Sequence, residues 1–174
     1  MKSFLAVLAI PLAIYASSPT PSPTAVAPSE VSSYELFWPI VHGRVMGDSL
    51  YPLKGFKEKI LEFLNFSQYK KVDYNISLAE KRLVEAEYLV LTKKDLTNTG
   101  KSLEVGKKKL ERVLGLMGTL KTQGVNVTDL ESRFRNSIEK QLLLLRSMET
   151  SVSEESKALI RDYSEYLNSL FSKI

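Results

Sequence analysis

Residues 67–94 read SQYKKVDYNISLAEKRLVEAEYLVLTKK, the clearest helical pattern in this sequence. Apolar residues recur there at alternating steps of four and three, which keeps a narrow seam turned toward a partner helix. Such a seam needs further helices to cover it. The pattern therefore predicts a packed helical bundle. The seam consists of Val72, Ile76, Ala79, Leu83, Ala86 and Val90.

Apolar residues return at helical spacing in four more segments, which predicts a helix in each. The first begins near Pro52, because proline is tolerated in the first helical turn. We interpret every apolar face as the side that packs in the bundle. These faces are Leu53, Phe56, Ile60 and Leu64; Leu103, Gly106, Leu110, Val113, Met117 and Leu120; Leu130, Phe134, Ile138, Gln141, Leu145, Met148 and Val152; and Leu159, Tyr163, Tyr166, Leu170 and Ile174.

Turn signals separate the predicted helices. Residues 95–100, DLTNTG, and residues 124–128 predict turns, and Thr128 with Glu131 and Ser151 with Glu154 have the spacing of capping boxes. Short connections allow the chain to fold back and cover its own seams. We therefore expect an all-α fold, an antiparallel helical bundle of about five helices in a domain of residues 51–174. A coiled-coil oligomer is the alternative, and a monomer is favoured.

The N-terminal residues have the character of an export signal. Lys2 precedes an apolar run at residues 4–16 that ends in the small residue Ala16. This pattern is typical of a cleavable signal peptide, residues 1–16, and the run falls short of the ~20 residues of a membrane span. A retained membrane anchor is the weaker alternative. Residues 17–33, SSPTPSPTAVAPSEVSS, form a polar, proline-rich spacer that we expect to be disordered.

An aromatic arm follows at residues 34–50, YELFWPIVHGRVMGDSL. Pro39 and Gly43 argue against one continuous helix, so we expect an extended or broken segment that packs on the bundle. The alternative is a docking strip for another protein, since buried aromatic residues dominate interface energetics. His42 is the only histidine and is interpreted as structural. The candidate interaction surface consists of Phe37, Trp38, Ile40, Val41 and Tyr51.

Composition leaves few parts for catalysis. Cysteine is absent, which excludes disulfides, thiolate metal sites and cysteine nucleophiles. Glu80 and Glu85 could in principle act as an acid–base pair, but their position beside the apolar seam favours ion pairing. Lys107, Lys108 and Lys109 fan across a predicted helix, and we interpret them as part of its solvated face rather than as a contact for an anionic surface. We therefore predict no catalytic residues, no metal and no cofactor.

Two elements resemble an uncharacterised bacterial extracytoplasmic family of unknown function. They are DSLYPLK at residues 48–54 and AEKRLVEAE at residues 79–87, and the resemblance spans residues 47–87. It implies a helical domain outside the cytoplasm and implies no reaction.

The expected protein is therefore an exported, non-catalytic helical domain. It would bind an envelope protein or another envelope component, or act as a structural element, without a stable transmembrane anchor after cleavage and without nucleic acid. An extracytoplasmic chaperone or stress sensor is the first alternative. A hydrolase built on carboxylates is the weakest.

Overall fold

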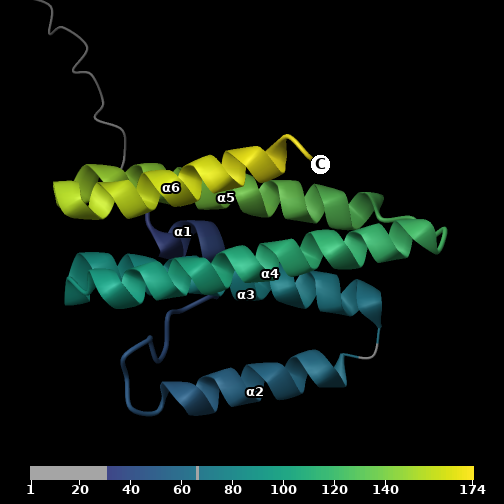
Figure 1. Ribbon diagram of the computed structural model, residues 1–174, viewed down its shortest axis with the longest axis horizontal. Coiled ribbons are helices and arrows are strands. Elements are labelled where there is room, and N and C mark those ends of the chain that lie inside the picture. The colour runs from purple at the N-terminus through teal and green to yellow at the C-terminus, as the bar shows by residue number, and fades with distance from the viewer. Residues whose placement is uncertain (1–30, 66) are drawn as a thin grey trace, which may run out of the picture.

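A computed structural model describes residues 31–65 and 67–174 (Figure 1). The predicted signal peptide and nearly all of the predicted linker lie outside the described residues. Within them the chain is all-helical and has no strand. The elements are α1 Ser33–Phe37, α2 Tyr51–Leu64, α3 Gln68–Tyr88, the short π-helix η1 Leu89–Lys93, α4 Leu96–Thr122, α5 Thr128–Ser151 and α6 Glu154–Phe171.

The long helices form layers (Figure 1). Helices α3 and α4 lie side by side in the middle and pack extensively on each other, while α5 and α6 form a second layer above them. The short helix α1 contacts both α3 and α5. Consecutive helices from α2 to α6 run in opposite directions, as the sequence predicts. Helix α2 lies at the outer edge of the bundle, beside α3.

The core lies along the predicted seams. All six seam residues, five in α3 and Val90 in η1, are buried, and so are the six predicted positions of α4. Gly106 lies where α4 approaches α6 closely, because a Cβ there would come within 2.8 Å of the Tyr163 hydroxyl oxygen. Gly115 and Gly118 have open space around them, so they do not serve this purpose. The prediction of a packed bundle is confirmed.

The predicted turn at residues 95–100 is wrong. The chain reverses at Lys94, which has a positive φ of 54°, and α4 already begins at Leu96. Asp95 caps this helix, since its Oδ1 accepts a 3.0 Å hydrogen bond from the Asn98 backbone N–H. Poor helix formers are favourable in a first turn, where their side chains can bond to free backbone groups.

Neither predicted capping box forms. Helix α5 begins at Thr128 without a side-chain cap, and the Asn126 side chain accepts the Thr128 N–H instead at 2.9 Å. Ser151 ends α5, so the cap position of α6 falls on Ser153. A capping box that the sequence reading missed joins Ser32 and Glu35 at the start of α1. Spacing alone does not show which of several nearby hydroxyl residues will precede the first turn.

The aromatic arm is broken, as predicted, but its first part is helical. Helix α1 was not predicted and turns Phe37 into the core. Residues 38–50 then run without helix to the start of α2. His42 stacks on the Tyr88 ring, with the ring centroids 4.0 Å apart. The arm therefore fastens to α3 through a ring contact beside its buried phenylalanine.

Candidate functional site

Helix α2 turns its charged side toward the bundle. Glu58 is its only buried residue among those the structure describes, and Lys54 and Glu62 are half-buried. We call the side that carries these three residues the inner face. The interpretation of the apolar side of residues 51–64 as the packing side is wrong. Both sides recur at helical spacing, and the charges that attract the inner face belong to other helices.

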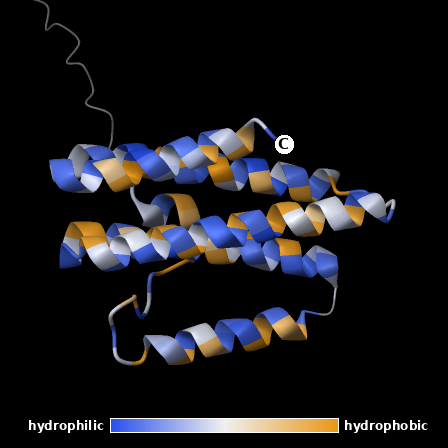
Figure 2. Cartoon of the chain, viewed as in Figure 1, coloured by the Kyte–Doolittle hydropathy of each residue, from blue (hydrophilic) through white to orange (hydrophobic). Residues whose placement is uncertain are grey.

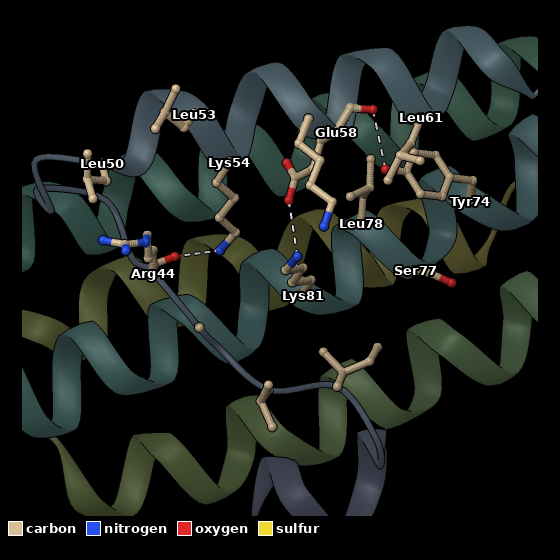
Figure 3. Close-up of a pocket in the computed structure, with 14 residues that line it drawn as sticks. Arg44, Leu50, Leu53, Lys54, Glu58, Leu61, Tyr74, Ser77, Leu78 and Lys81 are labelled. Atoms are coloured by element: carbon tan, nitrogen blue, oxygen red, sulfur yellow. Dashed lines mark hydrogen bonds and ion pairs between the residues drawn. The ribbon is translucent and has the colours of Figure 1, made fainter.

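Two buried carboxylates share one guanidinium beneath α2. Arg82 on α3 pairs with Glu58, and its Nη1 donates a 2.6 Å hydrogen bond to Oε1 of Glu85. Lys81 adds a second cation, 3.2 Å from Oε1 of Glu58, and Lys54 pairs with Glu85. In Figure 3, Glu58 and Lys81 point toward each other from the two helices. The junction of α2 and α3 is therefore ionic rather than apolar.

Lys54 also joins the arm to this junction. Its ammonium group donates hydrogen bonds to the backbone carbonyls of His42, at 3.0 Å, and Arg44, at 2.5 Å. Tyr51 lies beside it and donates a 3.4 Å hydrogen bond to Oε2 of Glu85. One lysine thus connects the arm, α2 and α3.

Burial and charge perturb the groups of this junction. Burial raises the pKa of the Tyr51 phenol, and the neighbouring Glu85 charge raises it further. Burial lowers the pKa of Lys54 against the opposing effect of Glu85. Burial also opposes the charge of Arg82, but Glu85 and Glu58 outweigh it and raise the Arg82 pKa. The charged groups of this junction pair with one another, and these pairs hold α2 against α3.

The other half of the inner face contacts both α3 and α4. The Tyr74 hydroxyl donates a 3.3 Å hydrogen bond to the Glu58 carbonyl, and the Asn75 amide donates one of 3.1 Å to Glu62. Lys109 on α4 lies 2.8 Å from the Glu62 carboxylate. Polar contacts therefore run along α2 from Tyr51 to Glu62.

A groove of about 590 Å³ lies between the arm, α2 and α3. Figure 3 shows Lys54, Glu58, Tyr74 and Lys81 on its walls. Its apolar lining comes from Ile40, Val41, Leu50, Leu53, Leu61 and Leu78. Most of these side chains are partly exposed, so the groove offers apolar surface next to cations.

The opposite side of α2 is apolar and exposed. At about 100° per residue, Leu53, Phe56, Ile60, Phe63 and Leu64 span about 100° of the circumference, with Lys57 and Lys59 at the two edges. Leu61, 40% exposed, lies beyond Lys57 and lines the groove. Phe63 is 76% exposed and Phe56 64%. Figure 2 shows hydrophobic residues along this helix at the edge of the bundle. The outer face, as we name it, consists of Leu53, Phe56, Ile60, Phe63 and Leu64 with Lys57 and Lys59.

The five predicted interaction residues do not form one surface. Phe37 is buried in the core, whereas Trp38 is 64% exposed. Ile40 and Val41 line the groove, and Tyr51 is half-buried at the ionic junction. Ile40 and Val41 thus adjoin α2, and a second cavity of about 430 Å³ near Arg133 is lined by Phe37, Trp38 and Ile40.

The candidate acid–base carboxylates lie in separate ion pairs. Glu80 accepts two hydrogen bonds from Arg133, at 2.8 and 3.2 Å, whereas Glu85 belongs to the junction under α2. The predicted ion pairing of both residues is confirmed. Within the described ranges, no cluster of three or more acidic or histidine side chains is arranged to hold a metal ion.

The three lysines of α4 form ion pairs, Lys107 and Lys109 with other helices and the exposed Lys108 within α4. Lys107 lies 2.6 Å from Asp162, Lys108 lies 3.7 Å from Glu104, and Lys109 bonds to Glu62. Each lysine therefore has a carboxylate partner. By contrast, Lys57 and Lys59 are exposed and make no ion pair with a described residue.

These features define an all-helical domain whose edge helix is held by buried ion pairs and presents an apolar outer face. The chain belongs to the DUF5667 family, domains of unknown function, whose sequence profile matches residues 44–155. The match includes α2 to α5 and extends well beyond the resemblance seen in residues 47–87. No curated protein and no solved structure matches the chain.

The sequence reading missed the outer face and the buried junction. A signal was present, because Lys54, Glu58 and Glu62 recur at steps of four along one side of α2. Charged stripes of this kind usually face solvent, so the spacing alone favours the wrong orientation. The combination of a charged stripe with arginine and lysine on the neighbouring predicted helix was the available clue.

Proposed function

We propose that this chain is a non-catalytic, envelope-associated module that binds its partner through the outer face of α2. The observation that carries the proposal is the orientation of α2. Lys54, Glu58 and Glu62 are held in contacts with α3 and α4, and the large apolar residues of the helix are left at the surface. Exposed apolar patches of this kind mark interaction sites.

The energetics of α2 support a binding role. Phe56 and Phe63 leave most of their surface exposed in the fold of their own chain, and fully burying a large apolar side chain is worth about 1.5–3 kcal/mol. A partner that covers them would recover this free energy. The envelope location rests on the export signal and spacer expected in residues 1–33.

The proposal is non-catalytic because the carboxylates that could serve as a general acid or base are already paired with cations. Glu80 is bound by Arg133, and Glu85 by Arg82 and Lys54. A general acid or base has to reach a substrate, and these carboxylates already have cationic partners.

Among the described residues, no helix is both long and apolar enough to cross a membrane.

The test is cell fractionation of the full chain expressed in a bacterium. Wild type should be found with the envelope, and Phe56→Ser/Phe63→Ser should move to the soluble extracytoplasmic fraction. Leu143→Ser is the matched control, since Leu143 is an exposed leucine on α5. Circular dichroism should show equal helicity. Retention of the double serine variant in the envelope, or a protein that never leaves the cytoplasm, would overturn the proposal.

The groove beside α2 favours a second candidate, an extracytoplasmic binder of unfolded client segments. Its apolar lining and its volume of about 590 Å³ could take a few side chains of an extended peptide. Val41→Asp and Leu78→Asp should then abolish the suppression of client aggregation. If wild type suppresses the aggregation of no client, this candidate is excluded.

A further inference from the structure

We infer that the outer face of α2 docks on a lipid bilayer that carries anionic headgroups. The inference rests on the binding role proposed above and names the partner. It starts from the arrangement of charge on α2. The two acidic residues of this helix, Glu58 and Glu62, are turned inward and paired with Arg82 and Lys109. The charged residues at the edges of the apolar stripe are both cations, Lys57 on one edge and Lys59 on the other.

Lysines on both edges of an apolar stripe match an anionic membrane surface. A helix that lies in the bilayer interface buries its apolar side about 5–10 Å deep, while lysine side chains reach up to the headgroups. In α2 the stripe carries two phenylalanines, Phe56 and Phe63, both well exposed. A bilayer accepts such a convex helix without a complementary groove, so it fits this single protruding face.

A second copy of the chain is a poorer occupant. If two outer faces packed together, Lys57 and Lys59 of one copy would approach the same lysines of the other. Neither α2 has an exposed carboxylate to pair with them, because its two glutamates are held within their own fold. Like charges across such a contact are unfavourable. The charge pattern therefore selects an anionic partner over self-association.

The inner face explains how the helix can be presented in this way. Lys54, Glu58 and Glu62 bind α2 to α3 and α4 through ion pairs and hydrogen bonds. The apolar residues are consequently not required to hold the helix in place. Helix α2 can thus keep its position on the bundle while its outer face enters the interface.

The absence of cysteine from the chain permits a local test in the full-length protein. An environment-sensitive dye is attached to Phe63→Cys on the outer face, and to Leu143→Cys on α5 as the matched control. Figure 1 shows α5 and α2 in different layers of the bundle. The local readout matters because residues 4–16 could attach the whole chain to vesicles independently of α2.

The probes are vesicles of phosphatidylcholine alone and of phosphatidylcholine with an equal part of phosphatidylglycerol. We expect the dye at position 63 to shift to the blue with the anionic vesicles only, and the dye at position 143 not to respond. Lys57→Gln/Lys59→Gln in the Phe63→Cys chain should weaken binding roughly 25-fold, since each lysine near an anionic surface contributes about fivefold. Added salt should weaken it as well.

Three results of the vesicle experiment would overturn the inference. They are an absent shift at position 63 with anionic vesicles, an equal shift at position 143, and a shift that is indifferent to the two lysine substitutions. Sedimentation of wild type as a dimer that Phe56→Ser/Phe63→Ser dissociates would also overturn it, in favour of self-association. If the outer face does not bind anionic vesicles but envelope association still depends on Phe56 and Phe63, the lipid assignment is overturned and the binding role remains. If the vesicle experiment and the fractionation experiment both fail, the lipid assignment and the binding role are both overturned.

Discussion

Lys109 on α4 donates a 2.8 Å hydrogen bond from Nζ to Oε2 of Glu62 on α2. This bond ties the edge helix to a second helix in addition to α3. Arg82 secures Glu58 one turn earlier along α2. Because the two glutamates of α2 face inward to these cations, its large apolar residues remain outside. The predictions below test this arrangement.

Glu85→Gln should lower the free energy of unfolding by about 3–5 kcal/mol, because it removes the carboxylate that Lys54 pairs with and leaves the buried Arg82 with Glu58 alone. Urea denaturation followed by circular dichroism measures the change. The control is Asp162→Asn, which removes the partner of Lys107. Asp162 is largely exposed, so its loss should cost less than about 1 kcal/mol. Equal losses in the two variants would contradict a buried network under α2.

The contribution of Glu62 should depend on pH. Burial alone would raise the pKa of this carboxyl, but the hydrogen bonds from Lys109 and Asn75 and the Lys109 charge lower it below its ordinary value of 4.5. A lowered pKa in the folded state stabilises the fold fully above pH 4.5 and less as the pH falls through the folded value.

Glu62→Gln should therefore be less stable than wild type at neutral pH, and the difference should shrink as the pH falls below 4.5. Thermal unfolding at a series of pH values measures it. Lys109→Met should abolish most of the same dependence. A difference between wild type and Glu62→Gln that stays constant into acid would exclude the Lys109 pair as its source.

Gly106→Ala and Gly115→Ala should change stability in opposite directions. A Cβ at Gly106 would lie 2.8 Å from the hydroxyl oxygen of Tyr163, a fully buried side chain that bonds to Gln141 and has little room to move. We expect a loss of about 1–3 kcal/mol. Gly115 has open space around it, so alanine should add up to about 1 kcal/mol through helix propensity. Urea midpoints compare the two, and a gain at both positions would contradict the close approach of α4 and α6.

Phe63→Ser should alter stability by less than about 0.5 kcal/mol, because this side chain is mostly exposed. Leu83→Ala, in the fully buried seam of α3, should cost about 2–5 kcal/mol. Equilibrium unfolding measures both. A large loss for the phenylalanine variant would mean that the apolar side of α2 packs inward, and the proposals on the outer face would then fail.

Much of the bundle follows from the sequence. The seam of Val72, Ile76 and Leu83 predicts α3 and its buried side, because the spacing of apolar residues along a helix is a local property. The helix ends were predicted less accurately, since Asp95 caps α4 and Ser153 occupies the cap position of α6, whereas both helices were expected to begin elsewhere. The tertiary structure also decides the environment of each predicted interaction residue. Phe37 and Trp38 are neighbours in the chain, but one lies in the core and the other at the surface.

The chain sequence determines that residues 51–64 form a helix with one charged and one apolar side. It does not determine which side faces the bundle, because both sides have the same period. The partners of Lys54, Glu58 and Glu62 lie 31, 24 and 47 residues farther along the chain. Only the packing of α3 and α4 brings Glu85, Arg82 and Lys109 together beneath α2. Their charges turn the polar side inward, and the apolar outer face is the consequence.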